Sequence, residues 1–168
     1  MSSVQTKAVI LDEEAIKRKI RRIALEVAEQ NASEKEVIIA GIIGNGETVA
    51  QCVADELSKI SSIKTTVVTI QLNKRSLGDV TLQPAIDINQ QNIIIADDVA
   101  NTGKTMFYAL KPFLNSSPKK IQTLALVERS HKLFPVQTDY VGLSIATTLQ
   151  EHITVQTADG KVTGAWLH

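Results

Sequence analysis

Apolar residues recur at every third or fourth position near the start of the chain. Asp12 precedes this run, and Glu13 and Glu14 follow Asp12 directly. Aspartate is a favourable N-cap, and acidic residues in the first turn suit the positive end of a helix. The pattern therefore predicts an amphipathic helix after Asp12. Its buried face is expected to carry Ile16, Ile20, Ile23, Ala24 and Val27.

Runs of apolar and β-branched residues then alternate with helical periodicity. The runs occupy residues 37–42, 65–72, 92–96 and 121–127. Such runs are typical of strands that are buried on both faces of a parallel sheet. The helical patterns are at residues 47–60 and after residue 105, with core positions at Val49, Val53, Leu57, Met106, Leu110, Phe113 and Leu114. The alternation predicts an α/β fold with a central, mainly parallel sheet flanked by helices.

Residues 73–91 break this alternation. They are polar, contain Gly78 and Pro84, and show no clear period, so we expect a functional or mobile loop. Shorter strand-like segments follow at residues 140–146 and 153–156, and Trp166 is expected to pack within a C-terminal strand. The sequence contains no internal repeat and no linker, so residues 1–168 are predicted to form a single domain.

Composition and charge narrow the class of protein. Apolar residues make up 43% of the 168-residue chain and charged residues 21%, which excludes a disordered or collagen-like chain. Lys plus Arg and Asp plus Glu both number 18, so the whole chain lacks the net positive charge of a dedicated nucleic-acid binder. We interpret the basic residues at 17–22 as a solvated helix surface, with an RNA or partner surface as the alternative.

The cysteine count and the apolar runs bear on cellular location. Cys52 is the single cysteine, so an intrachain disulfide is excluded. No stretch approaches the roughly 18 consecutive apolar residues of a membrane span. Residues 1–7 lack the apolar core of a signal peptide. We therefore expect a cytoplasmic protein that does not bind membranes.

Residues 97–105 carry the candidate chemistry. They follow an apolar strand, and ligands of open α/β sheets bind beyond the carboxyl ends of the strands. The N–H groups of a short polar loop and a helix start suit a phosphate, and Thr102 and Thr105 add hydroxyl groups. Asp97 and Asp98 would repel a phosphate, so they require another partner, such as sugar hydroxyls or a divalent metal ion.

Two other interpretations of this segment are weaker. Gly103-Lys104-Thr105 matches the end of a nucleotide P-loop, but Asp98 stands where that motif requires a glycine. A structural turn with surface acids is the second alternative. It leaves unexplained why an acid pair, a small polar loop, a glycine and a threonine follow a buried strand in one unbroken run.

Residues 93–105, IIIADDVANTGKT, resemble the phosphoribosyl-pyrophosphate signature of type I phosphoribosyltransferases. That signature is an apolar strand, two acidic residues and a Thr-Gly-x-Thr phosphate loop. The segments LDEEAIKRKIRRIALEVAEQN, VIIAGIIGNG and LALVERSHKLFPVQTDYVG are similar to the bacterial uracil phosphoribosyltransferase and pyrimidine-operon attenuator proteins. The resemblance covers most of the chain. It implies a central parallel sheet with a small hood formed from the chain ends.

The resemblance also implies roles for individual residues. Asp97 and Asp98 would hold the ribose hydroxyls of phosphoribosyl pyrophosphate and, through the ribose or water, a Mg²⁺ cofactor. The 5′-phosphate would bind to the phosphate loop, which we define as Ala100, Asn101, Thr102, Gly103, Lys104 and Thr105. The pyrophosphate would lie against the turn at Ile43, Gly44 and Asn45. Lys74 and Arg75 would belong to a mobile loop that closes over the site, and Glu128, Arg129 and Val141 would border the nucleobase.

Two departures from the family pattern bear on the activity. Uracil-type relatives usually carry Thr-Arg-Gly where this chain has Gly44-Asn45-Gly46, so a charged contact with pyrophosphate is absent. Glu128 stands where the 6-oxopurine enzymes carry a lysine, which argues against hypoxanthine or guanine.

We therefore expect a magnesium-dependent transferase that joins a pyrimidine base, uracil in the first place, to phosphoribosyl pyrophosphate. Its partners would be that donor, a nucleobase and a second copy of the chain in a homodimer. A nucleotide-sensing, RNA-binding regulator of pyrimidine genes is the main alternative. The missing arginine favours the regulator and zero net charge disfavours it, since RNA affinity depends on neutralising phosphates. A transferase for another base is the third possibility.

Overall fold

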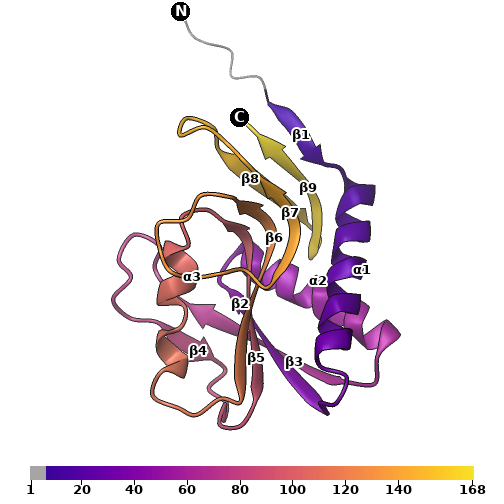
Figure 1. Cartoon of the computed structure of the whole chain (residues 1–168), viewed down its shortest axis with the longest axis vertical. Helices are drawn as coiled ribbons and strands as arrows, with labels where there is room; N and C mark the ends of the chain where they lie inside the picture. Colours follow the sequence, from indigo (N-terminus) through magenta and orange to yellow (C-terminus); the bar gives the residue numbers. More distant parts are fainter. Residues whose placement is uncertain (1–6) are drawn as a thin grey trace, which may run out of the picture.

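A six-stranded sheet forms the centre of the molecule (Figure 1). The computed structural model describes residues 7–168. The strands lie in the order β4 (Thr81–Gln83), β3 (Lys64–Gln71), β2 (Glu36–Ile42), β5 (Asn92–Ala100), β6 (Lys120–Arg129) and β7 (Tyr140–Ile145). β4 runs antiparallel to β3, and the other neighbouring pairs are parallel. The predicted α/β fold with a mainly parallel sheet is confirmed.

Helices cover both faces of this sheet. They are α1 (Glu13–Gln30), α2 (Asn45–Ile60), α3 (Lys104–Tyr108) and the 3-10 helix η1 (Lys111–Phe113). Ile39 of β2 belongs to the buried cluster under α1 and α2, whereas its neighbour Ile38 belongs to the cluster that contains the buried side chains of α3 and η1. Successive strand residues point to opposite faces, and both faces are buried, which explains the unbroken apolar runs.

The first helix begins where the sequence predicts. The Asp12 carboxylate accepts a hydrogen bond from the backbone N–H of Ala15 at 2.8 Å and so caps α1. The predicted apolar face is buried. Asp12 thus fixes the point at which the chain leaves the first strand and enters the helix.

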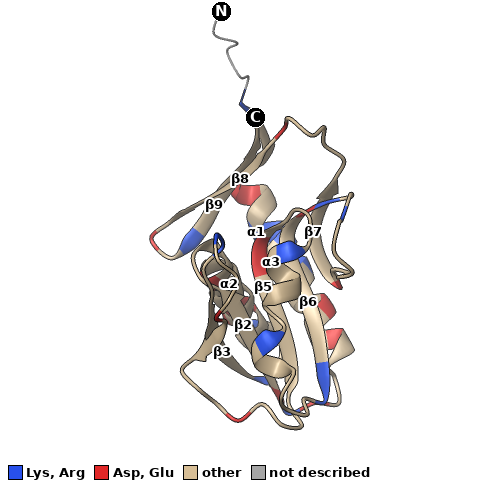
Figure 2. Cartoon of the chain, turned by 90° about the vertical axis from the view of Figure 1, so that its left-hand side faces the viewer, with Lys and Arg blue, Asp and Glu red and all other residues tan. Residues whose placement is uncertain are grey.

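A second, smaller sheet forms the hood. It consists of β1 (Ala8–Leu11), β9 (Lys161–Leu167) and β8 (Ile153–Ala158), paired antiparallel in that order. Figures 1 and 2 show it at the upper end of the molecule, built from both ends of the chain. β8 contacts β5 and α2, which brings the hood to the carboxyl end of the central strands. The hood from the chain ends is confirmed.

The helix after residue 105 is shorter than predicted. α3 ends at Tyr108, and the chain passes into η1, which has Pro112 near its start. Proline has no backbone N–H and its ring clashes with the preceding turn, so an α-helix does not continue through this position. Met106 and Phe113 are buried, but Leu114 is 69% exposed, and its assignment to the core is wrong.

Other differences concern the ends of elements. β5 continues through the acid pair to Ala100, so Asp97 and Asp98 lie at the end of a paired strand rather than after it. β4 falls within the predicted loop 73–91. Residues 1–6, part of the segment expected to lack a signal peptide, lie outside the described residues. Within residues 7–168, every helix is too short or too polar to cross a membrane.

Candidate active site

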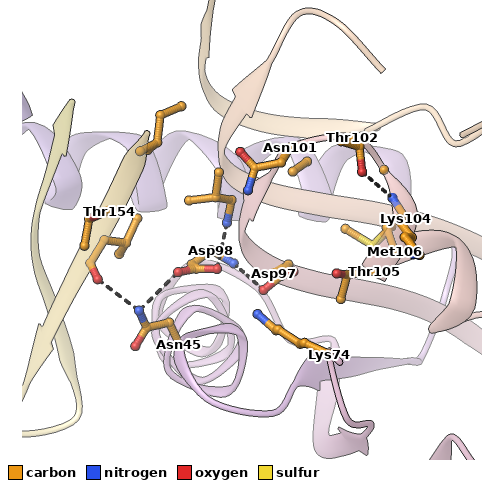
Figure 3. A pocket seen from close by; sticks show the side chains of 15 residues that line it. Asn45, Lys74, Asp97, Asp98, Asn101, Thr102, Lys104, Thr105, Met106 and Thr154 are labelled. Atoms are coloured by element: carbon orange, nitrogen blue, oxygen red, sulfur yellow. Dashed lines mark hydrogen bonds between the residues drawn. The ribbon is translucent and has the colours of Figure 1, made fainter. Parts of the chain in front are cut away.

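A cavity of about 280 Å³ lies at the carboxyl end of β5 (Figure 3). Four parts of the chain form its walls: the start of α2, the loop after β3, the segment that joins β5 to α3, and the hood strand β8. The lining residues are Asn45, Lys74, residues 97–106 and residues 153–155. The cavity therefore lies where open α/β sheets bind their ligands.

Asp97 and Asp98 differ in burial and partners. Asp97 is 3% exposed, and its Oδ1 accepts a hydrogen bond from the backbone N–H of Asp98 at 2.9 Å. Asp98 is half-buried, and its Oδ1 accepts from the N–H of Val99 at 2.8 Å. Burial raises the pKa of the Asp97 carboxyl well above its usual value, the charge of Asp98 raises it further, and Lys74 opposes the shift. An acid so costly to ionise is typical of a functional site.

The phosphate loop presents donors to the same cavity. Thr102 Oγ1 accepts a hydrogen bond from the N–H of Lys104 at 3.3 Å, which leaves its own hydroxyl proton available. After Lys104, the next N–H groups of α3, those of Thr105 and Met106, have no acceptor within the helix. Because α3 has five residues, these N–H groups, rather than a long helix dipole, are what an anion would meet.

A neighbouring segment holds the phosphate loop in place. The carbonyl of Thr102 accepts hydrogen bonds from the N–H groups of Leu133 at 2.8 Å and Phe134 at 3.1 Å. Gly103 takes φ +85°, a left-handed conformation that costs a side-chain-bearing residue about 1–2 kcal/mol. The loop is thus shaped by its own glycine and pinned by residues 133–134, so its donors are preorganised.

Asn45, the residue in place of the family's arginine, is held by three hydrogen bonds. Its Nδ2 donates to Asp98 Oδ2 at 3.1 Å and to the Val155 carbonyl at 2.9 Å. Its Oδ1 accepts from the Thr157 hydroxyl at 3.2 Å. Figure 3 shows the Asn45 side chain between the acid pair and the hood strand. Asn45 therefore lines the predicted site, but its side chain is hydrogen-bonded to other residues of the protein.

The loop after β3 brings one cation to the cavity. Lys74 points toward Asp97 (Figure 3), whereas Arg75 does not line the cavity. The same loop is tied to η1, because the Lys111 ammonium donates to the carbonyls of Leu77 at 2.9 Å and Gly78 at 2.8 Å. Lys74 therefore lies on a loop that is anchored three to four residues further along the chain.

The remaining predicted site residues lie outside the cavity. Glu128 pairs with Lys132, the Arg129 guanidinium donates to the Thr148 carbonyl at 2.7 Å, and the Val141 carbonyl accepts from Arg22 at 3.0 Å. Ile43 and Gly44 do not line it either; their N–H groups are bonded to Ile70 and Glu47. The structure brings together the acid pair, the phosphate loop, Asn45 and Lys74. The roles of the other residues stay predictions.

The sequence did not predict that residues of the hood line the cavity. Ile153, Thr154 and Val155 line the cavity opposite the acid pair. Apolar and polar residues alternate over 153–156, so a half-exposed strand was foreseeable. That this strand faces Asp98 depends on the tertiary fold, and no local pattern in the sequence signals it.

The metal-ligating side chains of the cavity suit a hard divalent cation only if the substrate supplies further ligands. Among residues 7–168, no three His, Cys, Asp or Glu side chains gather to hold a metal ion. Mg²⁺ commonly binds one or two carboxylates together with substrate phosphates and water. Asp97 and Asp98 fit that pattern, since they offer carboxylate oxygens in the cavity beside the phosphate loop.

Comparison with known proteins agrees with this arrangement. Residues 8–159 match the family described as the phosphoribosyl transferase domain. The chain is 34% identical over 165 residues to the bifunctional protein PyrR of Clostridium kluyveri, covering 93% of each chain. It is 35% identical over 162 residues to the bifunctional protein PyrR of Bacillus subtilis, covering 89% of this chain and 90% of the relative.

Solved structures show the same fold at lower identity. The hypoxanthine phosphoribosyltransferase of Trypanosoma cruzi superimposes with a TM-score of 0.74 at 16% identity, covering 83% of this chain and 82% of that one. A hypoxanthine-guanine phosphoribosyltransferase of Bacillus anthracis gives a TM-score of 0.68 at 21% identity, with 84% of each chain covered. On its match over residues 8–159 and its likeness to these relatives, the chain belongs to the phosphoribosyltransferase domain family.

Proposed function

We propose that this protein transfers ribose 5-phosphate from phosphoribosyl pyrophosphate to uracil and releases pyrophosphate. The observation that carries the proposal is the single cavity shared by the acid pair, the phosphate loop and Lys74. A sugar phosphate needs acceptors for its hydroxyls and donors for its phosphate. The cavity offers both side by side.

The acid pair suits the charge that develops on the sugar. When pyrophosphate leaves the anomeric carbon, the ribose gains oxocarbenium character, and carboxylates already held beside it stabilise that charge. Asp97 is fixed by its burial and by the N–H of Asp98. The carboxyl oxygens are therefore held in position before the reaction and need little reorganisation.

The phosphate loop and Lys74 act on the two ends of the donor. The loop's N–H groups and the Thr102 and Thr105 hydroxyls would bind the 5′-phosphate and orient the sugar. Lys74, brought in with its loop, would add positive charge near the leaving group and exclude water. Mg²⁺, when bound with the donor at Asp97 and Asp98, would neutralise pyrophosphate charge.

Uracil is proposed as the base on two grounds. The curated relatives that the chain matches over about nine-tenths of its length are PyrR proteins, and the sequence resembles the uracil-type branch. Glu128, beside Ala100 on the neighbouring strand, is an acid where the 6-oxopurine enzymes carry a lysine. Glu128, which is paired with Lys132, cannot donate the hydrogen bond that the lysine of those enzymes gives to the purine oxygen.

RNA-dependent regulation is the second candidate, and the relatives' description as bifunctional supports a second role for this chain. The basic run on α1 gives it little support as a binding surface. Lys17 pairs with Glu13 and Glu14, and Arg21 pairs with Glu56. Cations that are already paired release fewer counterions on binding RNA.

A base panel tests the proposal. Uracil, cytosine, hypoxanthine and guanine are each mixed with phosphoribosyl pyrophosphate, Mg²⁺ and the protein, and pyrophosphate release is followed. Uracil should give the highest kcat/KM, and removal of Mg²⁺ by a chelator should suppress turnover. Faster release with a purine would overturn the choice of base.

A homodimer and a cytoplasmic location are further parts of the proposal. Light scattering tests the homodimer, and cell fractionation tests the location.

A further inference from the structure

Asn45 joins three parts of the site that are far apart in sequence. It stands at the first position of α2 and contacts Asp98 of β5 and the main chain of the hood strand β8. The contacts span 53 residues to Asp98 and 110 residues to Val155. The hood is thereby fastened to the acid pair through one side chain.

The chemistry of the three contacts fits an asparagine closely. Two of the partners, a carboxylate oxygen and a carbonyl oxygen, are acceptors and require an N–H₂ group. The third, the Thr157 hydroxyl, donates to the amide oxygen. An aspartate would repel Asp98 and lose both donors, and an alanine would lose all three bonds.

We infer that Asn45 is a positioning residue that fastens hood strand β8 to Asp98, and that it does not contact the pyrophosphate of the donor. Asp98 Oδ1 is bonded to the Val99 N–H and Oδ2 to Asn45, so both oxygens are fixed in direction. A carboxylate has about four lone-pair sites, which leaves two for sugar hydroxyls. The part of the inference that concerns ligands rests on the proposed function.

The two roles for Asn45 predict different ligand profiles. If Asn45 contacted pyrophosphate, its loss would weaken the binding of phosphoribosyl pyrophosphate and of free pyrophosphate, but not that of uridine 5′-monophosphate. If Asn45 is a positioning residue, it acts through Asp98 and the hood. Both sugar phosphates, phosphoribosyl pyrophosphate and uridine 5′-monophosphate, would contact these parts of the site. Loss of the Asn45 contacts should therefore weaken both sugar phosphates by a similar factor and leave free pyrophosphate unchanged.

The experiment combines amide hydrogen exchange of the free protein with calorimetric titrations of the three ligands. Asn45→Ala should speed exchange over residues 153–158. It should also weaken both sugar phosphates by roughly three- to tenfold, the range that corresponds to one or two lost hydrogen bonds. Thr157→Val, which leaves Asn45 in place and does not line the cavity, should shift both readouts in the same direction by a smaller factor.

A matched control lies on the same hairpin. The Thr163 hydroxyl donates to the Gln156 carbonyl of β8 at 3.2 Å, outside the cavity, so Thr163→Val should leave all three affinities unchanged. Unchanged exchange over residues 153–158 in Asn45→Ala would overturn the fastening of the hood. A loss confined to the pyrophosphate-bearing ligands would overturn the positioning role. If wild type binds neither sugar phosphate, the proposed function fails, and hydrogen exchange alone then supports or overturns the fastening.

Discussion

Gly46 brings the start of α2 into direct contact with Asp97. A Cβ atom at Gly46 would lie 3.2 Å from Asp97 Oδ1 and 2.9 Å from the carbonyl oxygen of Ala96. The second distance is shorter than real Cβ contacts allow, and the obstructing atom is backbone. The spacing between α2 and the acid pair therefore depends on the absence of a side chain at this residue.

Gly46→Ala should destabilise the protein and impair the site together. Overpacking against a strand that cannot shift typically costs about 1–3 kcal/mol in the free energy of unfolding. Gly78→Ala is the control for stability, because a Cβ at Gly78 meets nothing within 4 Å. Denaturant unfolding of both variants provides the measurement. An unchanged unfolding midpoint for Gly46→Ala would show that α2 can move away from β5 at no cost.

Asp97→Asn should make the protein more stable at neutral pH. The folded-state pKa of Asp97 is raised above its usual 3.8, chiefly by burial, so ionised Asp97 opposes folding. Stability from this group is fully present below the unfolded-state pKa and is lost as pH rises through the folded-state pKa. The asparagine variant should therefore gain stability at pH 7–8, and the gain should shrink as pH falls through the folded-state pKa.

Thermal unfolding across pH measures this effect. A gain of about 1 kcal/mol would raise the Tm by roughly 2–4 °C for a chain of this size. Asp87→Asn, at an exposed carboxylate, is the control and should change the Tm little at pH 7.5. If Asp97→Asn lowered the Tm at pH 7.5, the charged form of Asp97 would be stabilising the fold rather than opposing it.

Thr105→Val tests the phosphate loop. If its hydroxyl bonds to the charged 5′-phosphate, the substitution should weaken binding of uridine 5′-monophosphate by about 1–3 kcal/mol. Binding of uracil, which has no phosphate, should be unaffected. Calorimetry with both ligands measures the difference, with Thr163→Val as a variant outside the cavity. Equal losses for both ligands would point to a general disturbance of the site.

Lys111→Met tests the anchor of the loop that carries Lys74. The ammonium of Lys111 holds the carbonyls of Leu77 and Gly78, and its removal should leave residues 73–80 more mobile. Loss of such exposed contacts should cost about 0.5–1.5 kcal/mol, and kcat should fall more than affinity for uracil. Limited proteolysis within residues 73–80 provides an independent readout.

Lys119→Met is the matched control for that variant. Lys119 is likewise a surface lysine, but its ammonium pairs with Glu34 rather than with carbonyls of the loop after β3. It should therefore leave kcat and cleavage of residues 73–80 unchanged. Unchanged kcat in Lys111→Met as well would show that the anchor has no influence on Lys74.

The strands of the central sheet and the acid pair could be predicted from the sequence. Ile38 and Ile39 face opposite sides of β2 and are both buried. Because both faces are buried, the strand appears in the sequence as a continuous apolar run, which can be recognised before the fold is known. Asp97 and Asp98 stand out because they extend a buried apolar run, whereas carboxylates are rarely buried unless they are paired. The phosphate loop was recognisable because its residues are contiguous in the chain.

The hood's contribution and the contacts of Asn45 could not be predicted. Asp98 meets Asn45 only after β5 pairs with β2, and Val155 meets it only after the hood folds over the sheet. Contacts this far apart in sequence leave no local pattern. Leu114 was misassigned because its spacing fits a helix that Pro112 interrupts. Local periodicity thus reports on each element, and contacts between distant elements have to come from the structure.

The most direct test of the proposed function is pyrophosphate release from phosphoribosyl pyrophosphate and uracil by wild type and by the Asp97→Asn, Asp98→Asn double variant. Wild type should release pyrophosphate only when uracil is present. The double variant should remain folded by circular dichroism and lose most of the activity, because the pair is expected to stabilise charge on the ribose rather than to hold the fold. Turnover retained by the folded double variant would contradict the account.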